Sequence, residues 1–319
     1  MSQIYIIHEN DDWTAPLRVE LNRRELPFEE WFLDRGTIEL SSAPPHGVFY
    51  NRMSASSHTR GHRFAAEHTA AVLAWLERHD RVVVNDSRAM QLEVSKVVQY
   101  AALGSYGIRT PKTIAAVGRE EILEAARGFD RPFITKHNRG GKGLGVRLFK
   151  SLEALRSYVE SDAFEEPLDG ITLIQKYIEA PDASITRCEF VGGKFLYAVR
   201  VDTSQGFELC PADECKTGDE FCPATVSERP RFEILRSFHH DLLSPFAEFL
   251  AGNGIKIAAI EFIEDRDGIA YAYDVNVNTN YNADAERRAG LSGMGAVASY
   301  LGAELLRLNE KVLEAVCAS

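Results

Sequence analysis

Short apolar runs rich in β-branched and aromatic residues alternate with longer stretches of helical spacing over the first 85 residues. The runs have the length and composition of strands. The stretches between them, one ending near Leu26 and one over 62–78, have apolar residues three and four positions apart. Strands that alternate with helices in this way favour a small parallel α/β unit. The predicted strands are 4–8, 28–33, 47–51 and 81–85.

A second α/β module is predicted after this unit. Apolar residues recur at helical spacing over 86–106 and stop before Gly107 and Pro111, which predicts one helix that carries Lys96. Further strands are predicted at 112–117, 132–138, 145–150 and 171–180, with helices at 120–127 and from Ser151 onward.

The last third of the chain is predicted to contain a hairpin, a long helix, and a closing group of two strands and two helices. Gly192 and Gly193 form a two-residue turn between the strand-like runs 184–191 and 194–201. The long helix is expected around 231–251. No internal repeat and no low-complexity linker separates these parts.

Residues 203–229 form a polar loop that is too long for a simple connection, and such loops are usually functional or mobile. The loop holds Cys210, Cys215 and Cys222, whose spacing does not match the Cys-x2-Cys pattern of zinc sites. A loop on the acceptor side of a binding site is therefore favoured over a zinc site. The chain has 5 cysteines, an odd number that favours reduced thiols over a disulfide framework.

Composition and charge narrow the class of protein. With 319 residues, of which 45% are hydrophobic and 26% charged, the chain is expected to be a soluble globular protein of one large or two to three modest domains. A formal charge of -11 without a long basic run disfavours nucleic acid as a partner. No stretch reaches about 18 uncharged apolar residues and no signal peptide is visible, so no membrane partner is expected and the expected location is cytoplasmic.

The run Arg-Gly-Gly-Lys-Gly-Leu-Gly over 139–145 offers backbone N–H groups that can approach anionic oxygens. It lies between two predicted strands, whereas the Rossmann and Walker loops open a helix, so neither of those templates fits. Arg139 and Lys142 within the run, and Lys136 at the end of the leading strand, favour a flap that closes over a triphosphate. A plain mobile hairpin is the alternative.

A segment near the end of the chain predicts a second hairpin with convergent oxygen ligands. The tetrapeptide Asp-Arg-Asp-Gly separates two strand-like runs and is typical of a turn. The expected register pairs Glu264 with Ile269 and places Glu261 opposite Ala272. Asp274 then lies diagonally across from Glu261 on the same face, at about 7 to 8 Å between backbone positions.

Two-residue periodicity adds Asn276 and Asn278 to the face that carries Glu261 and Asp274. Two carboxylates and two amides are hard oxygen donors, which suit an octahedral Mg²⁺ ion that keeps water and phosphate oxygens among its ligands. Two alternatives stay open. The residues could form a solvated polar face, or a one-residue bulge could separate Glu261 from Asp274.

A turn before the second predicted helix places Arg52, Ser54 and Arg60 close together with His62. Arginine binds carboxylates through two parallel hydrogen bonds, so this turn is a candidate cradle for an anion or a substrate carboxylate. Ordinary surface arginines are the alternative. His62, like the pair at 239–240, has no visible partner and is assigned no chemistry.

These residues carry a resemblance to a known family. Over residues 85–305 the sequence resembles the ATP-grasp superfamily, in the branch of glutathione synthetase and the RimK-type glutamate ligases. The resemblance implies an α/β (α+β) ATP-grasp fold, with an N-terminal parallel α/β (pre-ATP-grasp) domain and two subdomains that sandwich ATP. The implied domains are 1–95, 96–180 with the glycine-rich flap, and 181–319 with the metal site.

The resemblance also implies a nucleotide site. Lys96 and Lys136 match the two nucleotide lysines of the family, and 171–180 resembles its hinge segment, whose backbone borders adenine. Glu179 or Asp182 would contact the ribose. The residues implied to bind the nucleotide are Lys96, Lys136, Arg139, Gly140, Gly141, Lys142, Gly143, Gln175, Lys176, Tyr177, Ile178, Glu179 and Asp182.

Catalytic and metal residues follow from the same resemblance. Arg187 and Arg200 match the arginines of the family, and Arg200 would face the γ-phosphate or an acyl phosphate. Glu261, Asp274 and Asn276 match its metal-binding acid, acid and asparagine. The residues expected to bind substrate are Arg52, Ser54, Arg60 and Asn278.

The function that the resemblance implies is ligation of a carboxylate to an amine, driven by ATP with one or two Mg²⁺ ions, for which Mn²⁺ is an alternative. An acyl phosphate is the implied intermediate, and an amino acid or peptide is the implied substrate. A small-molecule kinase of the same fold and a nucleotide-binding regulatory protein without turnover are the alternatives. A homodimer is compatible with the resemblance, and the identities of the carboxylate and the amine stay open.

Overall fold

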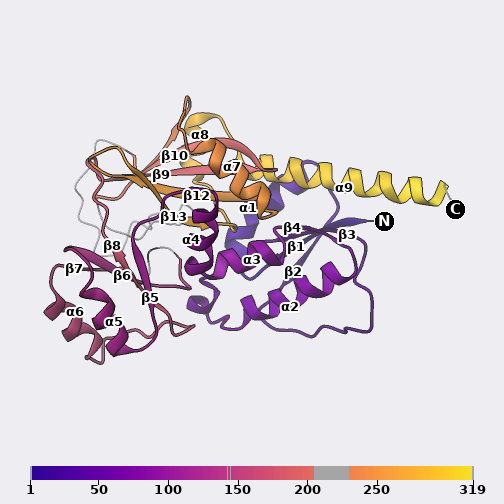
Figure 1. The fold of residues 1–319 in the computed structure, drawn as a ribbon. Helices are drawn as coiled ribbons and strands as arrows, with labels where there is room; N and C mark the ends of the chain where they lie inside the picture. The colour runs from indigo at the N-terminus through magenta and orange to yellow at the C-terminus, as the bar shows by residue number, and fades with distance from the viewer. Residues whose placement is uncertain (1, 142, 144, 205–229, 318–319) are drawn as a thin grey trace.

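The structure is a computed structural model that describes residues 2–141, 143, 145–204 and 230–317. Its strands form three sheets, seen as distinct groups in Figure 1. One sheet lies within each of the predicted ranges 1–95, 96–180 and 181–319, and the domain limits themselves stay a prediction. The predictions for Lys142 and for the cysteines of 203–229 fall outside the described residues.

The N-terminal sheet is parallel throughout, as predicted. Its elements are β1 (Gln3–His8), α1 (Asp11–Arg23), β2 (Phe28–Phe32), β3 (Gly47–Asn51), η1 (Ser57–Arg60), α2 (Ala65–Arg78), β4 (Val82–Val84) and α3 (Ser87–Val94), joined by the C-terminal helix α9 (Gly293–Cys317). The strand order is β2-β1-β3-β4. The strands β1 and β3 are apolar on both faces because α1 and α9 cover one face while α2 and α3 cover the other.

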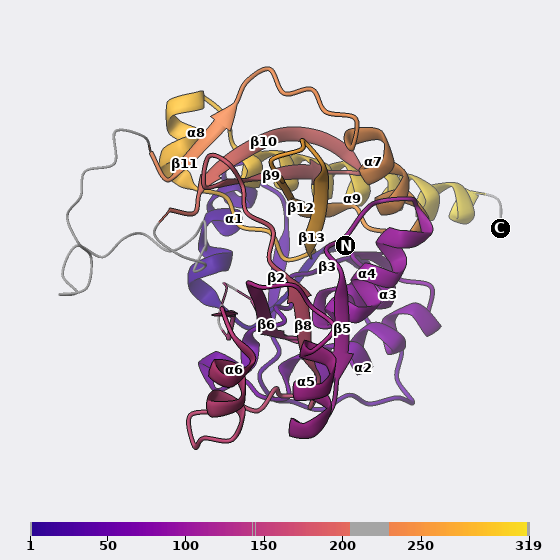
Figure 2. The same cartoon turned by 60° about the vertical axis from the view of Figure 1, so that its left-hand side comes forward.

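The second sheet is antiparallel, with the order β5-β8-β6-β7. Its elements are β5 (Thr113–Ala116), α5 (Arg119–Ala126), β6 (Phe133–His137), β7 (Arg147–Phe149), α6 (Leu152–Val159) and β8 (Thr172–Lys176). Figure 2 shows α5 and α6 together on one face of this sheet, where they pack around Phe133 and Leu155. The other face of β6 and β8 is left available to line a site.

The third sheet is also antiparallel, with the order β11-β10-β9-β12-β13. Its elements are α4 (Lys96–Ser105), β9 (Ser184–Val191), β10 (Lys194–Asp202), β11 (Phe232–Leu235), α7 (Leu243–Gly252), β12 (Ile257–Glu264), β13 (Ala270–Asn276) and α8 (Ala283–Ala289). The helices α4 and α7 pack on one face. The buried Asn85 joins this sheet to the first, because its side chain donates to the carbonyl oxygens of Ile257 and Val277 at 2.7 and 2.9 Å.

Two predicted helices are wrong in extent. The stretch 86–106 contains two helices, because Ser95 is extended at φ -142° and its side chain caps α4. The stretch 231–251 contains the edge strand β11 before the shorter α7, because the apolar run Phe232–Leu235 pairs with β10. The glycine turn at 192–193 is confirmed, and both glycines have positive φ, as a type I′ turn requires.

None of the helices in the described ranges has the length and apolar character needed to span a bilayer. The 25-residue α9 is the longest of them, and its C-terminal end extends past the sheets in Figure 1.

Candidate functional site

A cavity of about 510 Å³ lies where the two antiparallel sheets meet the N-terminal part of the chain. The strands β6 and β8 line it from the second sheet, and β9, β12 and β13 line it from the third. The loop after β3 contributes Ser54 and Ser56. The volume is that of a small-molecule pocket, and most of the predicted site residues lie on its walls.

The paired carboxylates of the predicted metal site face each other directly across β12 and β13. The predicted diagonal register is wrong, because Glu261 pairs with Asp274 and Glu264 pairs with Ala270. A bulge at Tyr273 shifts the register between Glu261 and the residue that follows it. The alternative that a bulge would separate the two acids is also wrong, since this bulge brings them opposite each other.

Glu261 is buried in a dense set of donors. Its carboxylate accepts from Arg187 Nη1 at 2.8 Å, from the Tyr273 hydroxyl at 3.0 Å and from Asn276 Nδ2 at 3.3 Å. Burial raises the pKa of Glu261, although Arg187 opposes that rise. Asp274 lies across from it and accepts from Lys96 Nζ at 2.6 Å.

The donor set around these acids fits a hard divalent cation. Glu261, Asp274 and Asn276 offer carboxylate and amide oxygens, and the cavity is open to a phosphate-bearing ligand on the same side. Buried carboxylates need neutralising charge, and Glu189 adds a third carboxylate behind Arg187, at 2.6 Å from its Nε. Arg187 bridges Glu189 and Glu261, and Lys96 pairs with Asp274, so these acids are held together in one cluster of charges on the cavity side.

The two lysines converge from different elements. Lys96 is the first residue of α4, and Lys136 lies in β6 with 6% of its surface exposed. Lys136 Nζ donates to the Tyr100 hydroxyl at 2.5 Å. Burial, and then the charge of Lys96, lower the pKa of Lys136 to about 7. Phosphate oxygens placed between these lysines would be neutralised from both sides.

The segment predicted to border adenine follows β8. Gln175 is buried and lines the cavity, and its Nε2 donates to Thr113 Oγ1 at 2.7 Å and to the Tyr100 hydroxyl at 3.0 Å. Lys176, Tyr177, Ile178 and Glu179 line the cavity beyond it, with apolar walls from both sheets. The apolar lining includes Ile134, Ile185 and Ile263 on strands of the two sheets, and Pro111 and Ala180 on the segments next to them.

Asp182 and Arg200 lie beside the cavity rather than on its wall. Their side chains form an ion pair at 2.7 Å, and the neighbours Ala183 and Thr203 provide the lining at this edge. Arg200 therefore does not face the phosphate end as expected, because Asp182 holds it at the rim. Arg187 does line the cavity, and it lies directly across from Glu261 in the sheet.

The glycine run forms the predicted hairpin between β6 and β7, with Ile134 paired to Leu148. Gly140, Gly141 and Gly143 line the cavity. Arg139 turns away from it, and its Nη1 pairs with Glu67 Oε1 of α2 at 2.5 Å. The described part of the flap thus presents backbone to the cavity and is fastened to the N-terminal part of the chain by an ion pair.

Replacing Gly141 by proline is expected to leave folding intact and to abolish turnover, since proline removes an N–H and locks φ in a loop that has to close. Gly141→Ala is the matched control. A Cβ at this position meets only Ser56 at 3.5 Å, so the alanine variant is expected to behave like the parent. Thermal unfolding and ADP release measured on both variants check the prediction, and unchanged turnover in the proline variant would reject the flap.

The two arginines of the predicted carboxylate cradle do not line the cavity. Arg52 is 2% exposed and donates to Asn280 Oδ1 at 2.9 Å and to the Trp13 carbonyl at 3.1 Å. Arg60 pairs with Glu9 at 2.5 Å and stacks over the Trp13 ring at 4.6 Å. Because Arg52 and Arg60 lie behind the cavity wall, the residues that they contact, Trp13 and Asn280, form the lining instead.

Several lining residues escaped the sequence prediction. Asn280 continues the two-residue spacing of Asn276 and Asn278, so extending that pattern by one step would have found it. Tyr100 does not line the cavity but supports it, because its hydroxyl accepts from Lys136 Nζ, and its place four residues after Lys96 on the same helix face was a usable signal. No sequence signal pointed to Trp13, Glu93 or Tyr273 as lining residues.

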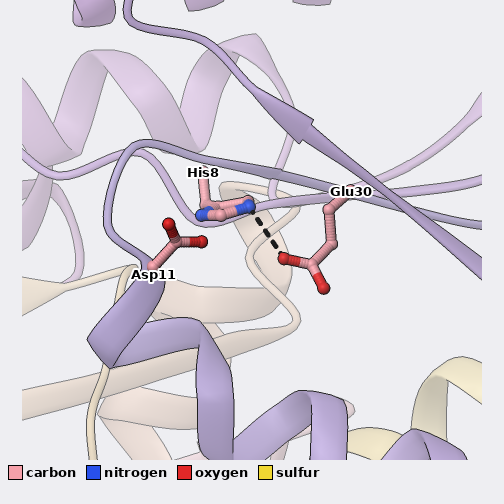
Figure 3. Close-up of side chains that lie close together, drawn as sticks. All are labelled: His8, Asp11 and Glu30. Atoms are coloured by element: carbon pink, nitrogen blue, oxygen red, sulfur yellow. Dashed lines mark ion pairs between the residues drawn. The ribbon is translucent and has the colours of Figure 1, made fainter.

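Figure 3 shows a second group of potential metal ligands, none of which is part of the cavity lining. His8, Asp11 and Glu30 meet at the carboxyl end of β1, with His8 Nε2 at 3.2 Å from Glu30. Arg18 already supplies a cation, because it donates two hydrogen bonds to Glu30 at 2.6 and 2.7 Å. Burial lowers the pKa of His8. The group is an ion-pair network that fastens α1 to the sheet.

Comparison with curated proteins gives partial matches, while no family model matches this chain. The chain is 31% identical over 103 residues to the alpha-aminoadipate–LysW ligase LysX of Sulfurisphaera tokodaii, covering 32% of this chain and 36% of LysX. It is 29% identical over 137 residues to a probable alpha-L-glutamate ligase of Vibrio vulnificus, covering 43% of this chain and 44% of that protein. The matches thus span less than half the length of these relatives.

Solved structures match over almost the whole chain. A RimK domain ATP-grasp protein from Sphaerobacter thermophilus superposes with a TM-score of 0.63 at 17% identity, covering 93% of this chain and 99% of that one. The ATP-grasp ligase PsnB, in a complex with minimal precursor, Mg and ADP, superposes with a TM-score of 0.63 at 15% identity, covering 95% and 97%. The chain has the ATP-grasp fold.

Proposed function

We propose that this chain, on its ATP-grasp fold, is an ATP-dependent ligase that joins a carboxylate to an amine through an acyl phosphate. One observation carries the proposal: Glu261 and Asp274 face each other beside Lys96 and Lys136 on the wall of one cavity. The names of the curated relatives, a LysW ligase and a glutamate ligase, support the same class of reaction.

Each part of the cavity has a role in this proposal. The nucleotide base would lie against residues 176–179, and Lys96 and Lys136 would neutralise the phosphates, since all of these residues line the cavity. Glu261, Asp274 and Asn276 would hold one or two Mg²⁺ ions, or Mn²⁺, which has the same preference for oxygen ligands. When bound, the ions neutralise phosphate charge. PsnB, a structural neighbour, was solved with Mg and ADP.

The chemistry needs no protein nucleophile. A carboxylate oxygen of the substrate attacks the γ-phosphorus, and ADP leaves with the electrons of the broken P–O bond. The amine then attacks the acyl carbon, phosphate leaves, and the amine loses a proton. The protein positions the reactants, neutralises charge and excludes water, and the glycine hairpin would close over the acyl phosphate.

The test is ADP release with ATP, Mg²⁺ and hydroxylamine across a panel of amino acids, small carboxylic acids and short peptides. Formation of hydroxamate that depends on the carboxylate is the expected result, because hydroxylamine traps acyl phosphates. ADP without hydroxamate would favour phosphoryl transfer to a hydroxyl, as in a kinase. ATP binding without ADP from any substrate would reject turnover and favour a regulatory role.

A further inference from the structure

The end of the cavity away from the adenine segment has a distinct chemical character. Its described walls include Trp13, Ser54, Glu93, Asn278 and Asn280, contributed by α1, the loop after β3, α3 and the chain that follows β13. The named relatives include glutamate ligases, so an acidic substrate would be the simplest expectation for this end. The side chains that line this end favour a different kind of substrate.

Asn278 offers an acceptor without a partner. Its side chain lines the cavity and is 9% exposed, and its Oδ1 is buried without a hydrogen bond among the described residues. A buried acceptor left unpaired costs free energy, so a ligand that donates an N–H to it would recover that cost.

Glu93 places a carboxylate beside this acceptor. Its two oxygens accept from the backbone N–H groups of Ala55 at 3.1 Å and of Val277 at 2.9 Å, and Val277 is the chain neighbour of Asn278. Each carboxylate oxygen has a second lone pair, and the group lines the cavity. Burial raises the pKa of Glu93, while the two backbone N–H groups and the charge of Lys96 oppose that rise. A ligand at this end therefore meets a carboxyl group and an unpaired amide acceptor.

The arginines near this end are engaged with other groups. Arg187 uses Nε, Nη1 and Nη2 to donate to Glu189, Glu261 and Thr279 at 2.6, 2.8 and 2.6 Å. Arg52 and Arg60 lie behind the wall and hold Trp13 in place from its carbonyl and from its ring. Within the described lining, this end therefore offers the indole ring of Trp13 together with the hydrogen-bond acceptors of Asn278 and Glu93.

We infer that this end binds the amine substrate, and that this substrate is neutral or basic rather than acidic. Its N–H groups donate to Asn278 and Glu93, and its apolar or planar part packs against Trp13. An acidic side chain would meet the Glu93 carboxyl group, and like charges placed side by side in a partly desolvated site repel each other. The inference rests on the proposed ligation, since that reaction supplies the need for an amine.

Binding of three amino acids to the protein with ADP and Mg²⁺ tests this inference without turnover. L-Glutamine and L-glutamate differ in side-chain charge at nearly equal size, and L-lysine adds a positive charge. Quenching of tryptophan fluorescence reports the dissociation constants, and Trp13→Phe, which keeps Trp31 and Trp75, shows whether the signal comes from this wall. Glutamine and lysine are expected to bind about tenfold or more tightly than glutamate.

Two substitutions of opposite sign sharpen the test. Asn278→Asp adds a negative charge, so it should tighten lysine binding and weaken glutamate binding further. Glu93→Gln removes a charge and should reduce the discrimination between glutamine and glutamate, although its amide faces two backbone N–H groups and could disturb folding. Asn278→Asp tests the same inference without altering the contacts between Glu93 and the two backbone N–H groups. Glu264→Gln, exposed at the end of β12, is the control and should change nothing.

Glutamate binding as tight as glutamine binding would overturn the inference, and so would no binding of any of the three below about 10 mM. Neither result touches the ligase proposal, which depends on hydroxamate formation from a carboxylate. Failure to form hydroxamate would reject the ligase proposal whatever the amine preference.

Discussion

Asp274→Asn is expected to lower ADP release on the order of 10² to 10³-fold, the size of loss seen when one group that stabilises developing charge is removed. The substitution keeps the shape and one oxygen of the side chain but removes the charge that pairs with Lys96 Nζ at 2.6 Å. Because a neutral amide is a weaker ligand for a hard cation, half-saturation by Mg²⁺ should move to higher concentration.

A titration of ADP release against Mg²⁺ separates metal binding from general damage. Glu264→Gln removes a carboxylate from β12 three residues beyond Glu261, but at an exposed position that lies outside the cavity lining. It should match the parent in both turnover and Mg²⁺ dependence. A parental Mg²⁺ midpoint in Asp274→Asn, whatever its turnover, would mean that this acid does not hold the ion.

The part of the site that depends on local spacing could be predicted from the sequence. Lys136 and the glycines after it occupy one strand and the turn that follows, so their proximity needs only the strand itself. Glu261 and Asp274 belong to one hairpin, and a short turn brings them to the same region whichever register it adopts. The alternation of strands and helices likewise predicted the parallel N-terminal sheet.

The register of that hairpin could not be predicted, because it depends on packing rather than on the turn. Tyr273 is the residue in the bulge, and its buried hydroxyl donates to Glu261 at 3.0 Å. A strand sequence does not show which residue a partner strand will skip. The same limit applied to Ser95, where capping of α4 outweighed a continuous helical pattern.

The direction of the N-terminal arginines depends on residues far away in the chain. Arg60 meets Glu9 at a separation of 51 residues, and Arg52 meets Asn280 at a separation of 228 residues. The sequence therefore predicted that Arg52 and Arg60 lie near the site, but not that their side chains point away from the cavity. Trp13 and Asn280 reach the cavity because these arginines hold them there.

Nucleotide affinity is expected to fall as the pH rises above 7, by up to about tenfold per unit, because Lys136 has to be charged to pair with phosphate. Burial lowers its pKa to about 7 in the free protein, so the ammonium form is lost above that pH. Phosphate oxygens beside Nζ favour the charged form and raise the pKa again, so binding takes up a proton.

The same group has the opposite effect on stability. A lysine whose pKa is lower in the folded than in the unfolded chain binds fewer protons when folded, between pH 7 and about 10.5. The unfolded chain binds more protons in that window, so the contribution of Lys136 to the free energy of unfolding rises with pH while ATP affinity falls. A general loss of structure at high pH would lower both ATP affinity and stability, whereas titration of Lys136 lowers the affinity and raises its contribution to the free energy of unfolding.

Calorimetry of ADP binding between about pH 7 and 9, in two buffers with different ionisation heats, measures both the affinity and the protons taken up. Phosphate groups are already ionised in this range, so their own titration contributes little. Lys136→Met should weaken binding about 10- to 100-fold at pH 7 and remove the proton uptake, because a charged hydrogen bond to phosphate is lost. Proton uptake that persists in the methionine variant would assign the titration to another group and leave Lys136 without its place at the phosphates.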